Sequence, residues 1–398
     1  MIGRSCTGQY NYLIEYPQLP NAMNITKVSF FHLRTPLRLQ FAQANQNTRR
    51  ADSVIVRLQT KEGSMGYGEA CPRTYVTGES ATGVMEALQQ IKAELCHQSF
   101  TTLADIEIWT GQLLADGAGP ALVCALELAL LDAWSWEYQQ DLAEAFPLQR
   151  APQDVSYSGV LPFGSWQKLR PLLAQFSFGS WKFKAQTEVA ANEQRIKDMQ
   201  ELFGTDLPIR MDANGGWNLE QARRQIEAGL ALGVNSFEQP LAAQATKDSQ
   251  KLVEEYGADA RIMADEALCT FADAKHLIDF QACNHFSLKL SKNGGLFNTL
   301  RIYQLAQKNG IACQLSAHYG ETSILSSAGL LFASIADQLT ACEGALGTFL
   351  LSEDITKTPV MVNRQGRING TDLSFMGWPV PVNDDSLKRN SVHMELGV

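Results

Sequence analysis

The sequence predicts an α/β fold, in which a closed (β/α)8-type barrel, of the modified TIM kind, follows a smaller N-terminal α+β domain. The first observation is length, since 398 residues are enough for about two to three domains. The second is periodicity: beyond Pro152, eight short apolar segments alternate with amphipathic ones at a nearly constant spacing. Strands that alternate with helices form a parallel sheet. Eight such repeats close a barrel, whereas a doubly wound sheet needs fewer strands and a Gly-rich first turn that this chain lacks.

The N-terminal part divides into an extension and a domain. Residues 1–23 are largely polar, with two prolines and no period, so we expect an extension outside the core. Residues 24–150 are expected to form the α+β domain. Its predicted strands are 25–33, 52–59 and 66–70, and its predicted helices are 81–98 and 119–140. The second helix is apolar on all faces, which indicates burial.

The barrel is expected over residues 151–354. Its predicted strands are 155–161, 181–185, 209–213, 236–239, 262–266, 285–290, 312–316 and 340–344. Amphipathic helices at 187–202, 218–232 and 296–308 fall between them. Residues 355–398 contain several turn residues and no helical period, and we expect this segment to pack back on the N-terminal domain.

Charge and hydropathy exclude two classes of partner. The chain has 33 Lys and Arg residues against 42 Asp and Glu residues, a net charge of −9, and no cationic cluster of the kind that displaces counterions from a nucleic acid. The longest apolar stretch, residues 121–134, contains Glu127 and Asp132 and is too short to span a bilayer. We therefore expect the protein to bind a small molecule and to bind neither a nucleic acid nor a membrane. We also expect it to be a homo-oligomer.

The eight cysteines are scattered along the chain, without a C-x-x-C motif or a close Cys/His spacing typical of zinc sites. The N-terminus also lacks a basic segment followed by an apolar one. Both features indicate free thiols in a reducing compartment, so a cytoplasmic location is expected.

Ionisable residues end five consecutive strands of the predicted barrel, where catalytic groups of such barrels lie. Alternation with period two places Lys182 and Lys184 on the same, inward face of their strand. The carboxylates Asp212, Glu238 and Asp265 end the next three strands, and Lys289 ends the sixth. Each charge alone would be an ordinary solvated strand end, but charges at the same location in five strands argue for a site in which they neutralise one another and a bound ion.

This pattern of charges indicates a specific chemistry. Three hard oxygen ligands suit Mg²⁺, which keeps open positions for substrate and acts as a Lewis acid on a substrate oxygen. Lysines on both sides of that ion suit proton abstraction from the carbon next to a carboxylate. A lysine base needs a lowered pKa, which a neighbouring cation provides by like-charge repulsion.

As a set, the motifs resemble those of the enolase superfamily, in its muconate lactonizing enzyme subgroup (mandelate racemase/muconate lactonizing enzyme-like), from about residue 25 to the C-terminus. The matching motifs are GYGEA at 66–70, YVTGES at 75–80, the Lys182-x-Lys184 pair, MDAN at 211–214, EQP at 238–240, ADE at 264–266, and Lys289 followed by NGG at 293–295.

The resemblance implies roles for these residues. Mg²⁺, or Mn²⁺ in its place, would bind the three carboxylates, with contacts to these ligands from Asn214 and Glu266. Lys184 and Lys289 would be the acid/base pair on opposite faces of the substrate, and Lys182 would assist Lys184. The N-terminal domain would cap the barrel mouth, and Tyr75 and Thr77 of the 75–80 loop would contact the substrate. Without the resemblance, Thr77 and Gly78 would only form a turn before a helix capped by Ser80.

The resemblance also implies a Mg²⁺-dependent enzyme that removes the α-proton of a carboxylate substrate to give a metal-stabilised enolate. We expect an isomerase: a racemase, an epimerase or a cycloisomerase, acting for example on an N-acylamino acid or a muconate-like acid. The alternative is a lyase or dehydratase of the o-succinylbenzoate synthase type, and a third is a barrel that has lost catalysis.

In the family that this chain resembles, residues at the ends of strands seven and eight determine which of these reactions takes place. Their ends carry His318, Glu321 and Glu343, which we expect to contact substrate, although a histidine at this place is often only hydrogen-bonded to the protein. Dipeptide epimerases of this family carry an Asp-x-Asp pair on strand eight for the substrate ammonium. The single Glu343 instead predicts a distal group that is acylated or otherwise uncharged.

Overall fold

The computed structural model describes residues 21–43, 46–146, 154–162, 164–369 and 374–397. Most of the predicted extension, residues 1–20, lies outside the described residues, as does the predicted domain boundary at 150–151. Within the described part of the chain, no helix is long and apolar enough to cross a membrane.

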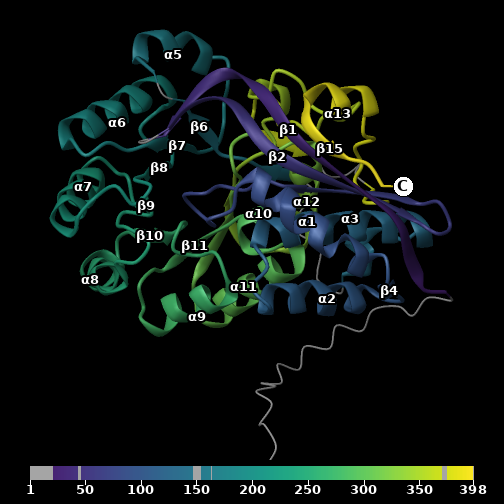
Figure 1. The fold of residues 1–398 in the computed structure, drawn as a ribbon. Helices are drawn as coiled ribbons and strands as arrows, with labels where there is room; N and C mark the ends of the chain where they lie inside the picture. The colour runs from purple at the N-terminus through teal and green to yellow at the C-terminus, as the bar shows by residue number, and fades with distance from the viewer. Residues whose placement is uncertain (1–20, 44–45, 147–153, 163, 370–373, 398) are drawn as a thin grey trace, which may run out of the picture.

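The N-terminal region is an antiparallel sheet covered by helices (Figure 1). The sheet order is β15-β1-β2-β3, with β4 paired to β1; the strands are β1 (Met23–Gln43), β2 (Gln46–Thr60), β3 (Met65–Ala70), β4 (Ser99–Phe100) and β15 (Ser391–Glu395). The helices are α1 (Ala81–Leu95), α2 (Leu103–Ala115), α3 (Pro120–Tyr138) and α4 (Leu142–Ala145). The three predicted strands and both predicted helices are present, and the first two strands are longer than predicted; α2 was not predicted.

Helix α3 is the centre of this region. Every residue from Ala121 to Ser135 is buried, which confirms the expectation from its uniform apolar character. It packs directly on β3 because Gly66 and Gly68 have no side chain. A Cβ at Gly68 would lie 2.0 Å from the Ala125 carbonyl oxygen, so only glycine permits this contact.

The second part is a curled sheet of eight parallel strands in the order β13-β12-β11-β10-β9-β8-β7-β6. The strands are β6 (Gly159–Leu161), β7 (Trp181–Lys184), β8 (Ile209–Asp212), β9 (Ser236–Glu238), β10 (Arg261–Ala264), β11 (His285–Leu288), β12 (Ala312–Leu315) and β13 (Leu339–Cys342). A parallel bridge between Tyr157 and Cys342 joins the two ends of the sheet. The predicted α/β barrel fold with an N-terminal α+β region is confirmed.

Helices lie on the outside of these strands (Figure 1). They are α5 (Trp166–Leu173), α6 (Val189–Phe203), α7 (Leu219–Ala231), α8 (Thr246–Tyr256), α9 (Phe271–Asp279), α10 (Leu290–Asn293), α11 (Leu296–Lys308) and α12 (Ser323–Ile335). A 3-10 turn, η1 (Gly347–Phe349), follows β13.

Three local predictions were wrong. The predicted strand 155–161 is two elements, because β5 (Asp154–Ser156) leaves the barrel to pair with β14 (Arg367–Asn369). The predicted strand 285–290 ends at Leu288, and Leu290 begins α10. The C-terminal segment contains α13 (Asp384–Asn390), whose first turn is capped by Asn383; seven residues are too few to show a clear period.

Two buried carboxylates of the N-terminal region hold the barrel beneath it. Glu69, at the end of β3, accepts hydrogen bonds from the Thr322 and Leu325 amides at the start of α12. Glu127 of α3 accepts them from the Leu296 and Phe297 amides at the start of α11. Free amides at a helix start need hydrogen-bond acceptors, so these contacts fix the N-terminal region to two barrel helices.

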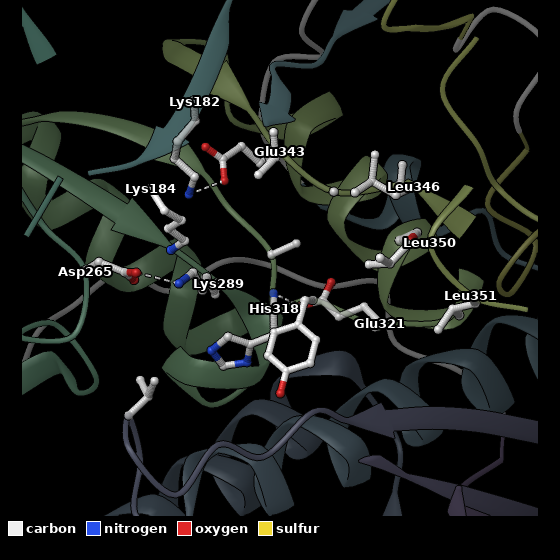
Figure 2. Close-up of a pocket in the computed structure, with 18 of the residues that line it drawn as sticks. Lys182, Lys184, Asp265, Lys289, His318, Glu321, Glu343, Leu346, Leu350 and Leu351 are labelled. Atoms are coloured by element: carbon white, nitrogen blue, oxygen red, sulfur yellow. Dashed lines mark hydrogen bonds and ion pairs between the residues drawn. The ribbon is translucent and has the colours of Figure 1, made fainter. Parts of the chain in front are cut away.

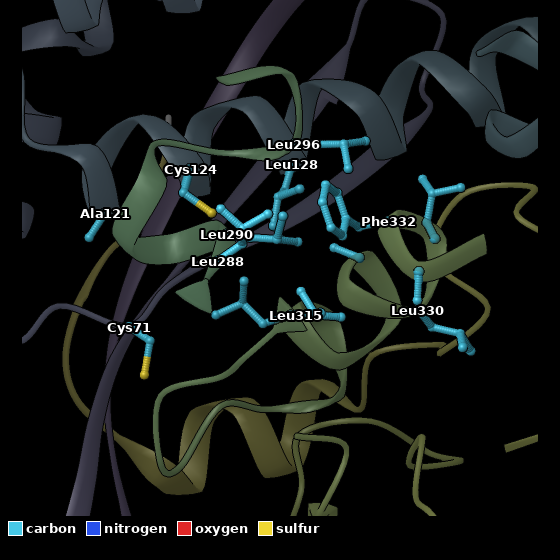
Figure 3. Packing of buried hydrophobic residues seen from close by; sticks show 14 of the residues in the cluster. Cys71, Ala121, Cys124, Leu128, Leu288, Leu290, Leu296, Leu315, Leu330 and Phe332 are labelled. Carbon is cyan, nitrogen blue, oxygen red and sulfur yellow. The ribbon is translucent and has the colours of Figure 1, made fainter. Parts of the chain in front are cut away.

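The core continues across the same contact. Figure 3 shows Cys124 and Leu128 of α3 beside Leu288 and Leu290, with Leu315 of β12 below them. All five residues are buried. Leu288 and Leu290 thus lie beside α3 (Figure 3).

Candidate active site

Three carboxylates stand side by side at the ends of adjacent strands. Asp212 ends β8, Glu238 ends β9, and Asp265 directly follows β10. The sheet order puts these strands next to one another, and Asp212 and Glu238 are register partners. Their side chains are 0%, 0% and 3% exposed, so each negative charge needs a partner.

Lysine ammonium groups supply those partners. Lys184 Nζ lies 2.6 Å from Asp212 Oδ2, and Lys289 Nζ lies 2.6 Å from Asp265 Oδ2. Lys182 Nζ lies 3.3 Å from both Asp212 and Glu238. Figure 2 shows the three ammonium groups pointing into one pocket. Because β7 and β11 flank β8, β9 and β10, Lys184 and Lys289 lie on opposite sides of the carboxylate row.

Two further cations were not among the predicted site residues. Arg210 of β8 lies 2.9 Å from Glu238 Oε2 and also pairs with Glu343. Lys292 is fully buried and lies 2.8 Å from Asp265 Oδ1. A signal for Arg210 is its position two residues before Asp212, on the same face of the strand. Lys292 follows Lys289 by three residues, one helical turn away.

The site contains equal numbers of acidic and basic side chains. Five acidic side chains (Asp212, Glu238, Asp265, Glu266 and Glu343) face five basic ones (Lys182, Lys184, Lys289, Lys292 and Arg210). Burial raises the pKa of Asp212, but Lys184 and Lys182 outweigh burial and hold that pKa below its usual value. Burial acts likewise on Asp265, where Lys289 and Lys292 hold the pKa well below its usual value. Both carboxylates are therefore anionic.

The three carboxylates are of the right chemical type to bind a divalent cation, but their oxygens are not arranged around a cation position in this structure. Anionic oxygens of Asp212, Glu238 and Asp265 are the ligands that Mg²⁺ prefers. Their oxygens are engaged by ammonium groups, and within the described residues no three His, Cys, Asp or Glu side chains are grouped as a ready metal site. A cation at these carboxylates would have to displace the lysines.

Asn214 and Glu266 support the carboxylate row. The Asn214 amide nitrogen of the main chain donates to Asp212 Oδ1 at 3.0 Å, and its Nδ2 donates to Glu266 Oε1 at 2.9 Å. Burial, with Asp265 and Asp212 nearby, raises the pKa of Glu266 to about 7. Gln239, which was not predicted, accepts hydrogen bonds from the Asp265 and Ala267 amides and so fixes the turn that carries Asp265.

The pocket beside these charges contains most of the predicted substrate-contact residues. Tyr75, His318, Glu321 and Glu343 line it together with Lys182, Lys184 and Lys289. Thr77 does not line it, although its neighbours Tyr75 and Val76 do. The predicted helix cap is also present, because Ser80 Oγ accepts a hydrogen bond from the Gly83 amide at the start of α1. The loop thus enters a helix and borders the pocket at once.

Glu343 is occupied by protein cations. Its Oε2 lies 2.7 Å from Lys182 Nζ, and Arg210 pairs with its other oxygen. The side chain is 4% exposed. Glu343 therefore belongs to the charge cluster of the barrel interior, and its charge is already balanced.

Comparison with known proteins gives consistent matches. Residues 167–374 match the family model described as enolase C-terminal domain-like. N-succinyl-L-Arg/Lys racemase of Bacillus cereus is 25% identical over 94% of this chain and 100% of its own length. Hydrophobic dipeptide epimerase of Enterococcus faecalis is 26% identical over 81% of this chain and 90% of its own length.

Solved structures agree with this fold. The crystal structure of the B. cereus N-succinyl Arg/Lys racemase superposes with a TM-score of 0.84 and 25% identity, over 94% of this chain and 100% of that one. The E. faecalis dipeptide epimerase complexed with Mg and L-Leu-L-Tyr gives a TM-score of 0.80 at 24% identity, over 89% and 99%. A muconate cycloisomerase variant gives 0.80 at 22% identity, over 92% and 99%.

Proposed function

Because this chain belongs to the enolase superfamily, whose C-terminal-domain model matches residues 167–374, we propose that it is an isomerase that removes the α-proton of a carboxylate substrate and returns a proton to the resulting enolate. A racemase or epimerase fits best, since returning the proton on the opposite face inverts the α-carbon. One observation carries this proposal: Lys184 and Lys289 lie on opposite sides of three buried carboxylates.

The carboxylates Asp212, Glu238 and Asp265 would hold Mg²⁺, with Mn²⁺ as a substitute. When bound, the cation would supply positive charge that stabilises the negative charge developing on the substrate as the α-proton leaves. The support for this assignment is the anionic state of Asp212 and Asp265 and their burial on adjacent strands.

The two lysines move the proton. A neutral lysine on one face accepts the α-proton, while the protonated lysine on the other face donates to the same carbon. Lys182 is a fixed positive charge two residues before Lys184, held by Glu238 and Glu343. We propose that this fixed ammonium assists Lys184 electrostatically during the proton transfer.

Residues of the N-terminal region complete the pocket. Tyr75 and Val76 border it from outside the barrel, and we propose that the 75–80 loop covers the distal part of the substrate and excludes water. We also propose that residues 24–150 form a capping domain, that residues 151–354 form the barrel, and that residues 355–398 return to the capping domain. The pairing of β15 with β1 supports it.

The partner is proposed to be a small-molecule carboxylate. The net charge of −9 and the seven free cysteines among the described residues support a protein of a reducing cytoplasm that binds no nucleic acid. A homo-oligomer stays a prediction, which sedimentation velocity would test.

An exchange experiment tests the function. Wild-type protein with Mg²⁺ is incubated in D2O with N-acylamino acids, dipeptides, muconate-like acids and the o-succinylbenzoate precursor. NMR reads exchange at the α-carbon, and mass spectrometry identifies products. We expect exchange with inversion, retained in Lys197→Ala, an exposed lysine of α6. Loss of a leaving group would assign a lyase, and no exchange in any class from folded protein would refute the proposal.

A further inference from the structure

His318 has an unused nitrogen in the pocket. It follows β12, is 6% exposed, and lines the same pocket as Lys184 and Lys289. Figure 2 shows its ring beside Lys289, below Glu321. Nδ1 lies 2.9 Å from the Cys71 carbonyl oxygen, whereas Nε2 is buried and has no hydrogen-bond partner among the described residues. A buried polar atom without a partner is costly.

The contact with Cys71 decides which nitrogen carries the proton. A carbonyl oxygen only accepts hydrogen bonds, so Nδ1 must be the donor. Burial, with Lys289 and Arg73 nearby, lowers the pKa of His318 well below its usual value. The ring is therefore neutral, and Nε2 presents a lone pair that can accept one hydrogen bond.

The surroundings select a neutral donor. The strongest charges acting on His318 are those of Lys289 and Arg73, with weaker effects from Asp265 and Lys292; Asp265 is already paired with both lysines. Glu321 accepts from the His318 amide at 2.6 Å, and burial raises the pKa of Glu321 to about 8, so this carboxyl is largely protonated at neutral pH. Close to His318, a substrate ammonium would therefore meet the positive charges of Lys289 and Arg73, which do not repel a neutral N–H.

We propose that His318 determines specificity by accepting, at Nε2, a hydrogen bond from a neutral N–H on the α-carbon of the substrate, as in an N-acylated amino acid. This inference rests on the proposed function, because the α-carbon must lie between Lys184 and Lys289 for proton transfer. An amide nitrogen bonded to that carbon then lies in the part of the pocket that His318 and Lys289 share. The same argument places a free amine at a disadvantage.

The test uses substrate pairs in which the N–H on the α-carbon is replaced by an ester oxygen. N-acetyl and N-succinyl derivatives of L-leucine and L-lysine are compared with the 2-acyloxy acids of the same side chains, by α-proton exchange in D2O with Mg²⁺. We expect wild-type protein to prefer the amide over the ester in kcat/KM by about tenfold, the effect of one lost hydrogen bond. His318→Leu should bring this ratio close to one, and His318→Gln, which keeps an acceptor, should restore part of it.

Leu346→Ala is the matched control, because Leu346 lines the pocket but has no side-chain acceptor; it should change both rates alike and leave the ratio intact. A ratio unchanged in His318→Leu would overturn the inference while leaving the isomerase proposal standing. Exchange observed only with muconate-like acids would also overturn the inference and leave the isomerase proposal standing. Absence of exchange in every class would refute the proposed function and this inference with it.

A measurement on the wild-type protein covers the case in which His318→Leu does not fold. In protein labelled with 15N-histidine, Nε2 of His318 should resonate as an unprotonated imidazole nitrogen. It should shift upfield when N-succinyl-L-leucine binds and not when the corresponding 2-succinyloxy acid binds. A protonated Nε2 in the free protein, or equal shifts with both compounds, would overturn the inference.

Discussion

The guanidinium of Arg73 lies over the ring of Tyr319, with its Cζ 4.3 Å from the ring centroid. Its Nη2 donates to the Tyr319 carbonyl oxygen, and its Nη1 donates to the carbonyl oxygens of Pro72 at 2.7 Å and Asp52 at 3.1 Å. One buried arginine thus ties the segment between β3 and the 75–80 loop to the barrel loop that carries His318 and Glu321. The two walls of the pocket are held in register by this side chain.

Arg73→Lys should lower both stability and activity. A lysine keeps the charge but cannot donate to three carbonyl groups from a planar fork while stacking on Tyr319. We expect a loss of about 3 kcal/mol in the free energy of unfolding and a rise in KM together with a fall in kcat. Urea titration and steady-state kinetics measure these, with Arg224→Lys on the exposed surface of α7 as control. Wild-type kinetics in Arg73→Lys would contradict a positioning role.

Asp265→Asn should weaken metal binding by more than about tenfold, because it removes one anionic oxygen from the proposed ligand set. The side chain keeps its size, so folding is expected to survive. Calorimetric titration of Mg²⁺ and Mn²⁺ into the apo-protein measures the affinity. Asp206→Asn, an exposed carboxylate, is the control, and equal affinities in the two variants would exclude Asp265 as a ligand.

Lys184→Ala and Lys289→Ala should each abolish inversion while leaving the other lysine in place. Loss of one acid/base group typically costs about 10² to 10⁴ in rate. We expect each variant to exchange the α-proton of only one enantiomer with solvent deuterium, and the two variants to differ in which one. NMR of separate L and D substrates shows this directly. Exchange of both enantiomers by Lys184→Ala would argue against the assignment of one lysine to each face.

Glu127 should make stability depend on pH. Burial raises the pKa of Glu127 to about 8, above its value of about 4.3 in an unfolded chain. The folded state then binds more protons between these values, so this residue stabilises below about pH 4 and the contribution is lost as pH rises toward 8.

Glu127→Gln removes that titration and can still accept the Leu296 and Phe297 amides. Between pH 5.5 and 8, the free energy of unfolding of wild-type protein should fall more steeply than that of the variant, by up to about 1.4 kcal/mol per pH unit. Urea unfolding at four pH values measures the two slopes. Parallel slopes would show that Glu127 stays ionised in the folded state.

Gly68→Ala should be strongly destabilising, since the added Cβ would meet the backbone of α3 at 2.0 Å. Backbone cannot move aside as a side-chain tip can, so we expect a loss of about 3 kcal/mol or more. Gly111→Ala is the matched control: it lies within α2 with nothing within 4 Å of the new Cβ. That variant should gain about 0.5–1 kcal/mol from helix propensity. Thermal unfolding separates the two, and equal melting temperatures would contradict the close contact of β3 with α3.

Sequence patterns alone were enough to predict the barrel and the row of charges at its strand ends. Period-two alternation and the regular spacing of apolar segments predicted all eight barrel strands, and the same alternation put Lys182 and Lys184 on one face. These are local properties, because alternation within a strand of four residues is enough to show which side chains share a face. The regions where the prediction was wrong, around Asp154 and after Leu288, are short elements whose state depends on a distant partner such as β14.

Which of these charged side chains contact one another depends on the packing of the folded chain. Glu343 lines the pocket, as its predicted contact with substrate requires. The sequence did not show that it also pairs with Lys182 and Arg210, from strands more than a hundred residues earlier in the chain. Local pattern also did not show that Glu69 and Glu127 contact the starts of two barrel helices, or that Nε2 of His318 has no partner among the described residues. A buried charge is stabilised by whatever opposite charge or donor the closed barrel brings within about 3 Å, and that neighbour is set by the packing of segments far apart in sequence.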